Sequence, residues 1–195
     1  AQVSVFLENT CIDTYQTKFG FREVKVDPDK GLFLNGRSVK INGVCAHQDF
    51  GLTGKAVPDN IHRYKIQLLK EMGANGYRCS HYPHPEAVMD ALDEYGFLVM
   101  AETRWFDSSE EGMQQLEMLV KRDRNHPSVI FWSTGNEEMH HVTEEGRRIC
   151  KSMVAKIKSL DNTRLITAAV SNDPDQATVY KELDVIGINY NIDKY

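Results

Sequence analysis

Residues 131–138 read Phe131-Trp132-Ser133-Thr134-Gly135-Asn136-Glu137-Glu138. The stretch begins as an apolar run and ends in polar residues, which predicts a buried strand with an amide and a carboxylate at its mouth. A carboxylate there is suited to protonating a leaving oxygen if partial burial raises its pKa. Glu137 could equally be a strand-end residue that pairs with an arginine, and the residues alone leave both interpretations open. Glu138 is expected to point elsewhere.

Apolar strands alternate with helical segments along most of the chain. The expected strands lie at residues 41–44, 74–78, 97–100, 128–133, 165–169 and 185–189. Gly73 should end the first helix, Pro85 and Gly96 should bound the second, the stretch Ser108-Ser109-Glu110-Glu111 predicts a capping box for the third, and Thr143 should cap the fourth.

This alternation predicts an α/β fold with a parallel sheet, either doubly wound or a (β/α)₈ barrel. No GxGxxG motif follows the first strand, so a dinucleotide-binding fold has no support. Polar residues instead follow five of the six strands, a pattern typical of the catalytic face of a barrel. They are His47 and Asp49, His81, Glu102, Asn136 and Glu137, Asn189 and Tyr190. A whole barrel needs eight strands and roughly 250 residues, so we expect a partial TIM barrel of six strands over residues 25–195.

The N-terminal part has a different texture. Residues 1–24 alternate loosely without a helical period and are expected to be the end of a β-domain. Asn35-Gly36 lies between two apolar runs, which is a strong hairpin signal.

Composition excludes several classes of function. The chain has 195 residues, 41% hydrophobic and 26% charged, with a net charge of −5 and no basic run, so nucleic acid is an unexpected partner. No apolar stretch is long enough for a membrane span, and the first ten residues do not read as a signal peptide, so localisation stays open. The four cysteines show no CxxC spacing and are expected to be free thiols.

Several ordered motifs resemble one family. Residues 121–130, leading into Trp132-Ser133 and Gly135-Asn136-Glu137, resemble glycoside hydrolase family 2, the β-galactosidase and β-glucuronidase family. Residues 19–22, 34–36, 42–44 and 78–83 resemble further segments of that family, in the same order. The resemblance implies that residues 1–24 end an immunoglobulin-like β-sandwich domain and that the remainder is an incomplete TIM-barrel catalytic domain.

The resemblance implies retaining hydrolysis of terminal β-glycosidic bonds. Glu137 would be the acid/base, and Asn136 would bind the sugar 2-hydroxyl. The family's nucleophile is a second Glu at the end of strand seven, at roughly 5–5.5 Å from the first carboxyl group. No residue of this chain is expected to take that position, so the isolated chain should be inactive.

Five further residues have roles that the resemblance implies. His47 and His81 would line the sugar subsite, Asp49 would bind sugar hydroxyls, Tyr190 would contact the nucleophile, and Arg78 would support the catalytic carboxylates. Each also has a structural alternative, such as a buried hydrogen bond or a salt bridge.

No metal or other cofactor is expected. Some family members bind magnesium through a Glu-Thr-His stretch after strand three, whereas this chain has Glu102-Thr103-Arg104 there. His140 and His141 do not form an HExxH motif. Trp105 could stack on a sugar ring or simply pack, and Trp132 is expected in the core.

We therefore expect a carbohydrate substrate, with β-galactosides ahead of β-glucuronides and β-mannosides. The alternative to an enzyme is a non-catalytic module that binds carbohydrate without hydrolysing it. An open six-stranded barrel would also expose sheet edges, which predicts a homo-oligomer of this chain.

Overall fold

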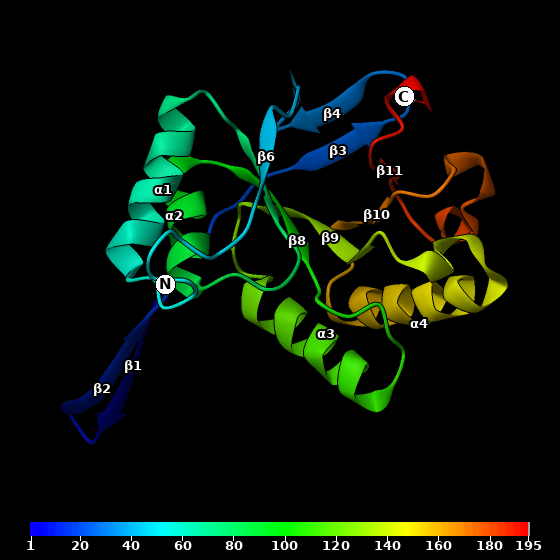
Figure 1. Cartoon of the computed structure of the whole chain (residues 1–195). Helices are drawn as coiled ribbons and strands as arrows, with labels where there is room; N and C mark the ends of the chain where they lie inside the picture. The colour runs from blue at the N-terminus through cyan, green and yellow to red at the C-terminus, as the bar shows by residue number, and fades with distance from the viewer. Residues whose placement is uncertain (195) are drawn as a thin grey trace.

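A computed structural model describes residues 1–194. Its centre is a six-stranded parallel sheet whose strands follow one another in chain order without a reversal (Figure 1). The strands are β6 (Gly43–Ala46), β7 (Gly76–Cys79), β8 (Leu98–Glu102), β9 (Val129–Asn136), β10 (Leu165–Val170) and β11 (Gly187–Ile188). A doubly wound sheet would reverse its strand order at a switch point, so the molecule is a partial (β/α)₈ barrel, as expected.

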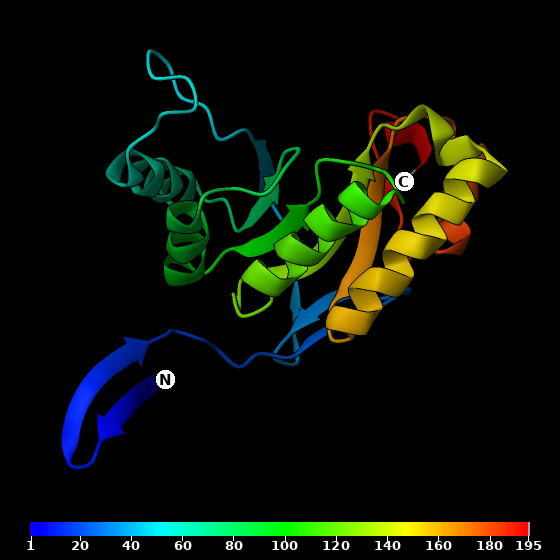
Figure 2. The same cartoon turned by 90° about the horizontal axis from the view of Figure 1, so that it is seen from below.

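Each of the first four crossovers carries one α-helix. All four helices lie on one side of the sheet, and a small antiparallel sheet formed by residues 24–39 lies on the other (Figures 1 and 2). The helices are α1 (Asp59–Glu71), α2 (Glu86–Tyr95), α3 (Glu110–Asp123) and α4 (Glu144–Leu160). The fifth crossover contains two short 3₁₀ turns instead of an α-helix, η2 (Pro174–Gln176) and η3 (Thr178–Lys181). Two further 3₁₀ turns lie elsewhere in residues 1–194: η1 (Met139–Val142) follows β9, and η4 (Ile192–Lys194) follows β11.

The helix boundaries follow local signals with one exception. Pro85 precedes α2, and Gly96 ends it in the left-handed region at φ 69°, as predicted. Thr143 caps α4 by accepting a hydrogen bond from the N–H of Gly146. The capping box expected before α3 does not form, because Asp107 binds the backbone and hydroxyl of Ser109 and makes Ser109 the cap.

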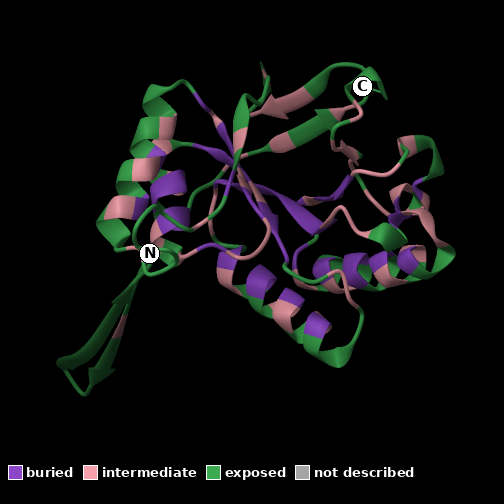
Figure 3. Cartoon of the chain, viewed as in Figure 1, coloured by how far each residue is buried: buried purple, intermediate pink, exposed green. Residues whose placement is uncertain are grey.

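The main core lies between the sheet and the helices (Figure 3). Trp132 of β9 is 1% exposed and donates its indole N–H to Asp161 at 2.9 Å, so it belongs to the core as expected. Burying a large apolar side chain of this kind contributes about 1.5–3 kcal/mol. This packing fixes the position of β9 and therefore of the Asn-Glu pair at its end.

A small antiparallel sheet covers the other side of the barrel strands. It consists of β3 (Val24–Asp27), β4 (Gly31–Leu34) and β5 (Arg37–Val39). Asn35 and Gly36 form its tight turn, with φ values of 50° and 76°. The favoured two-residue hairpin turn with this geometry requires a positive φ at both residues. Its apolar side chains pack on Leu98, Ile130 and Phe131 and so form a second core.

The N-terminal hairpin projects from the rest of the molecule (Figure 2). Its strands, β1 (Gln2–Leu7) and β2 (Thr10–Gln16), are exposed almost throughout. Arg22 ties the following segment to the barrel by donating to the carbonyls of Pro127 and Val129, both at 2.7 Å. The domain division after residue 24 stays a prediction.

All six strands differ from their expected bounds by at least one residue. The first begins at Gly43 rather than at residue 41, and the second at Gly76 rather than at residue 74. The fourth continues to Asn136, and the sixth contains only Gly187 and Ile188. All four cysteines are free, as predicted. None of the helices in residues 1–194 has both the length and the apolar composition needed to span a bilayer.

Candidate active site

A cavity of about 210 Å³ opens at the carboxyl ends of β6–β9. It is the face on which a TIM barrel carries its catalytic residues. Seven residues line it: His47, His81, Tyr82, Thr103, Arg104, Asn136 and Glu138. Three of the residues predicted for the site, His47, His81 and Asn136, are therefore brought together from the ends of three different strands.

Below the cavity lies a buried ion pair between Arg78 of β7 and Glu102 of β8. The Nε and Nη2 of Arg78 donate to Oε2 of Glu102 at 2.9 and 2.7 Å, and Ser133 donates its hydroxyl to the same oxygen at 2.7 Å. Glu102 is fully buried. Although burial opposes it, the charge of Glu102 raises the pKa of Arg78. The Arg78–Glu102 ion pair is therefore held in one position and can orient the side chains that contact it.

His81 contacts this ion pair directly, and His47 contacts His81. Nδ1 of His81 lies 2.6 Å from Oε1 of Glu102, and the two histidine rings meet edge to face at 5.3 Å. Nδ1 of His47 lies 2.9 Å from the hydroxyl of Tyr82. Because each Nδ1 has a partner, each ring can present Nε2 to a ligand in the cavity.

Asn136 is held by two donors. Its Oδ1 accepts from Nη2 of Arg78 at 2.6 Å and from Nδ2 of Asn189 at 3.3 Å. Since both partners are donors, the amide oxygen must face them, and the amide N–H₂ is left to donate to a ligand. This gives Asn136 one defined orientation.

Glu137 lies on the β11 side of Asn136. Its Oε1 accepts from Nδ2 of Asn189 at 2.6 Å, and its backbone adopts a φ of 59°. Tyr190 also has a positive φ, of 65°, and its hydrogen bond to Glu137 raises the pKa of the tyrosine. Non-glycine residues with positive φ cost free energy and gather at functional sites.

Glu138 is where sequence reasoning was wrong. We expected it to point elsewhere, but it lines the cavity, whereas Glu137 turns toward Asn189. Burial is the main cause that raises the pKa of Glu138, and nearby Arg104 opposes the shift. The positive φ of Glu137 breaks the alternation of a strand, which explains why the sequence pattern misassigned its neighbour.

Of the residues named from the sequence, Arg78, Glu137 and Tyr190 belong to the network beside the cavity rather than to its lining. Asp49 and Trp105 lie outside both. Asp49 is exposed in the loop after β6, and Trp105 is half-exposed with Arg104 stacked over its ring at 5.0 Å. Their roles in binding a sugar stay predictions.

Sequence reasoning also gave no role to Glu102 or Asn189, although both follow apolar strands. Glu102 is the centre of the buried network, and Asn189 joins Asn136 to Glu137. Their position at a strand end was the available signal. Their partners lie 21 to 53 residues away in the chain and could not be read from local spacing.

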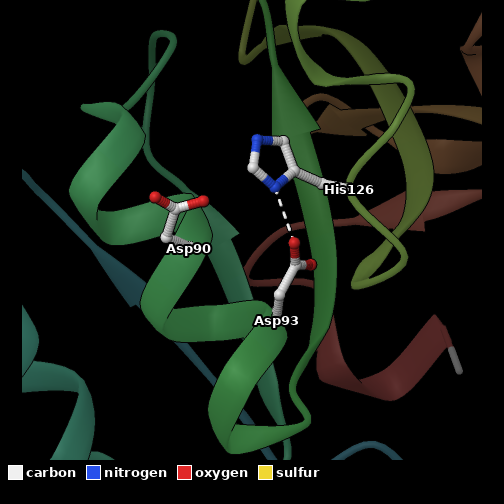
Figure 4. Close-up of side chains that lie close together, drawn as sticks. All are labelled: Asp90, Asp93 and His126. Atoms are coloured by element: carbon white, nitrogen blue, oxygen red, sulfur yellow. Dashed lines mark hydrogen bonds and ion pairs between the residues drawn. The ribbon is translucent and has the colours of Figure 1, made fainter. Parts of the chain in front are cut away.

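One group of potential metal ligands occurs within residues 1–194, away from the cavity. Asp90 and Asp93 of α2 lie near His126, with one ligand atom of each within 4.8 Å of the others (Figure 4). Asp93, however, already accepts from the His126 ring at 2.7 Å and from the N–H of Ser128 at 2.9 Å. These bonds fix the turn that leads into β9, so we interpret the group as structural.

The arrangement can bind a polyhydroxylated ring and move a proton. The cavity offers donors from Asn136 and acceptors from the histidines and Glu138. Glu137 is not one of its lining residues, but it follows Asn136 directly and shares Asn189 with it. A carboxyl group can exchange a proton with a ligand oxygen that comes within hydrogen-bond reach.

Comparison with known proteins identifies this architecture. The family model "Glycosyl hydrolases family 2, TIM barrel domain" matches residues 24–109 and 105–195. A β-galactosidase of Bacteroides ovatus is 35% identical over 96% of this chain and 27% of its own length. Human β-glucuronidase is 34% identical over 91% of this chain and 28% of its own length.

Solved structures agree. A family 2 member from Bacteroides cellulosilyticus superposes with a TM-score of 0.91 at 37% identity, over 98% of this chain and 27% of that one. An FMN-binding β-glucuronidase superposes with a TM-score of 0.90 at 32% identity, over 97% of this chain and 31% of its own. The chain therefore spans roughly a quarter to a third of the length of these relatives.

Proposed function

This chain belongs to glycosyl hydrolase family 2, and we propose that it forms strands one to six of a barrel that hydrolyses terminal β-glycosidic bonds, with β-galactosides as substrates. The observation that carries the proposal is the Asn136–Glu137 pair at the end of the fourth barrel strand. Arg78 and Asn189 hold this pair beside a cavity lined by two histidines.

In the proposed reaction, Glu137 donates a proton to the glycosidic oxygen as the bond to the sugar breaks. It then takes a proton from the water that completes hydrolysis. The amide N–H₂ of Asn136 donates to the 2-hydroxyl of the sugar, because its oxygen is already engaged by Arg78. The Arg78–Glu102 pair keeps His81 and Asn136 in place without taking part in proton transfer.

Retention requires a second carboxylate as nucleophile at roughly 5–5.5 Å from the first. We propose that this group comes from a part of a longer polypeptide and that residues 1–195 alone do not hydrolyse glycosides. An assay of the isolated chain with an aryl β-galactoside tests this point. Turnover that copurifies with the chain and is lost in Glu137→Gln would contradict it.

The main experiment is a substrate panel with the full-length protein. Aryl β-galactoside, β-glucuronide and β-mannoside are compared, and ¹H NMR follows which anomer of the free sugar forms first. Hydrolysis of the galactoside with the β-anomer appearing first is the expected result. A first-formed α-anomer would exclude retention, and failure to cleave any member would favour a binding module.

β-Glucuronidase activity is the second candidate. Proteins named β-glucuronidase from human and from Bacteroides fragilis are each 34% identical to this chain. Arg104 is a cation in the cavity lining, and a guanidinium can pair with the carboxylate of a uronic acid. Preference for the glucuronide in the same panel would establish this alternative.

We also propose that the isolated chain self-associates. β6 lies at one end of the six-stranded sheet, and strands in such a position pair readily between chains. Light scattering at micromolar concentration should give the mass of a dimer or a larger assembly. A monomeric mass would contradict the proposal.

A further inference from the structure

The cavity contains a carboxylate that the mechanism above does not use. Glu138 lines the cavity together with Asn136 and the two histidines, whereas Glu137 turns toward Asn189. The two adjacent glutamates thus face different surroundings.

Glu138 has no evident structural role. It occupies the N-cap position of η1, but its side chain makes no capping hydrogen bond. Within residues 1–194, no donor is recorded as hydrogen-bonded to its carboxylate, and Arg104 and His140 act on it only through their charges. A half-buried carboxylate that has lost water without gaining donors is costly. A ligand that brings hydroxyl groups would supply the missing donors.

The size and chemistry of the cavity limit what such a ligand can be. Its 210 Å³ is below the roughly 300–1,000 Å³ of pockets for drug-sized ligands, so it suits a single sugar ring. The two oxygens of a carboxylate can accept from neighbouring hydroxyls of one ring. Since Asn136 donates into the same space, both residues would contact the same ring.

We infer that Glu138 is a substrate-binding residue whose carboxylate accepts hydrogen bonds from hydroxyls of the glycone, the sugar on the non-reducing side of the cleaved bond. The inference rests on the proposed function and adds a specificity-determining residue to it. The charge of Glu138 also disfavours a carboxylate at the ring position that it faces, because like charges repel strongly in a desolvated site.

The test is a cycle of enzyme variants and monodeoxy substrates with the full-length protein. Glu138→Gln and Glu138→Ala are compared with wild type on the best aryl glycoside of the panel and on its 2-, 3-, 4- and 6-deoxy forms. Glu145→Gln is the matched control, because Glu145 is an exposed glutamate in the first turn of α4. Thermal unfolding of each variant shows whether it is folded.

For wild type and the control, removal of the hydroxyl that binds Glu138 should lower kcat/KM by about 10- to 100-fold, the range for a hydrogen bond to a charged group. In Glu138→Ala, removal of the same hydroxyl should cost less than about threefold. Glu138→Gln should lie between the two.

Two results separate the inference from its premise. If wild type cleaves no member of the panel, the proposed function itself is wrong. If wild type is active but every deoxy substrate suffers the same loss in Glu138→Ala as in wild type, Glu138 does not bind the glycone, and the proposed function is unaffected.

Discussion

The two ends of the barrel sheet both carry a buried arginine, but the two arginines are used differently. At the amino end of β10, Arg164 donates from all three nitrogens: to Val129, to Asp161, and to the carbonyls of Arg124 and His126. At the carboxyl end of β7, Arg78 gives Nε and Nη2 to Glu102 and Asn136, while its Nη1 has only a long contact of 3.9 Å with a sulfur atom.

The partners differ as well. Asp161 accepts from Thr163, Arg164 and Trp132, and against the effect of burial these bonds lower its pKa to about 2. All three nitrogens of Arg164 and both carboxylate oxygens of Asp161 are used by the fold. At the other end, within residues 1–194, the N–H₂ of Asn136 and the carboxylate of Glu138 have no hydrogen-bond partner, so both are left for a ligand. An arginine whose hydrogen bonds all go to structural groups stabilises the fold. An arginine that orients a side chain with unused hydrogen-bonding atoms at a cavity can instead support the binding of a ligand.

The largest effect is expected at Glu137. In the full-length protein, Glu137→Gln should lower kcat by about 10²- to 10⁴-fold for an alkyl β-glycoside, because its leaving group needs a proton. An aryl glycoside with a good leaving group should lose much less in the glycosylation step. Stopped-flow or steady-state kinetics with both substrates measure the difference, and equal losses would argue against a general acid.

Substitution of Arg164 should affect stability rather than catalysis. Arg164→Lys breaks the fork of bonds at the amino end and should cost about 3–5 kcal/mol of unfolding free energy. Urea denaturation measures this loss. Activity per folded molecule should match wild type, and a large drop in kcat/KM without unfolding would contradict the division between the two ends.

The matched substitution at the other end should give the opposite pattern. Arg78→Lys cannot bind Glu102 and Asn136 together, so we expect kcat/KM to fall by about 10- to 100-fold through misorientation of Asn136. The loss of unfolding free energy should be smaller than for Arg164→Lys. A stability loss as large as that of Arg164→Lys, with kcat/KM unchanged, would place Arg78 among the structural residues.

The last prediction concerns His141, a residue of η1. It is fully buried, neither ring nitrogen has a partner in the described chain, and burial lowers its pKa to about 4. As pH falls below about 6.5, His141 is protonated in the unfolded chain before it is protonated in the folded chain. Proton binding therefore favours the unfolded chain, and the free energy of unfolding decreases between pH 6.5 and 4.

The full loss attributable to His141 is about 3 kcal/mol at pH 4. His141→Leu should remove this component and flatten the pH dependence of the urea midpoint relative to wild type. His84, also buried with a pKa lowered to about 4, remains in both proteins and keeps the comparison matched. Parallel curves for wild type and variant would contradict the prediction.

Much of the fold could be predicted from the sequence because its signals are local. Apolar strands that alternate with capped helices indicated the parallel sheet, and Asn35-Gly36 indicated the hairpin of the small antiparallel sheet. The cap of α3 was misjudged by one residue, because Ser109, which donates its N–H and hydroxyl to Asp107, accepts the capping hydrogen bond from Gly112. The sixth strand was overestimated, because only Gly187 and Ile188 pair with β10.

The sequence by itself determined the order of strands and the presence of an Asn-Glu pair at the end of the fourth. Only the tertiary structure decided which of the two glutamates enters the cavity. Side-chain direction alternates along a regular strand, but the φ of 59° at Glu137 ends that regularity. The turn is accompanied by a hydrogen bond from Asn189, 52 residues away, so the surroundings of Glu137 and Glu138 depend on contacts that no local pattern contains.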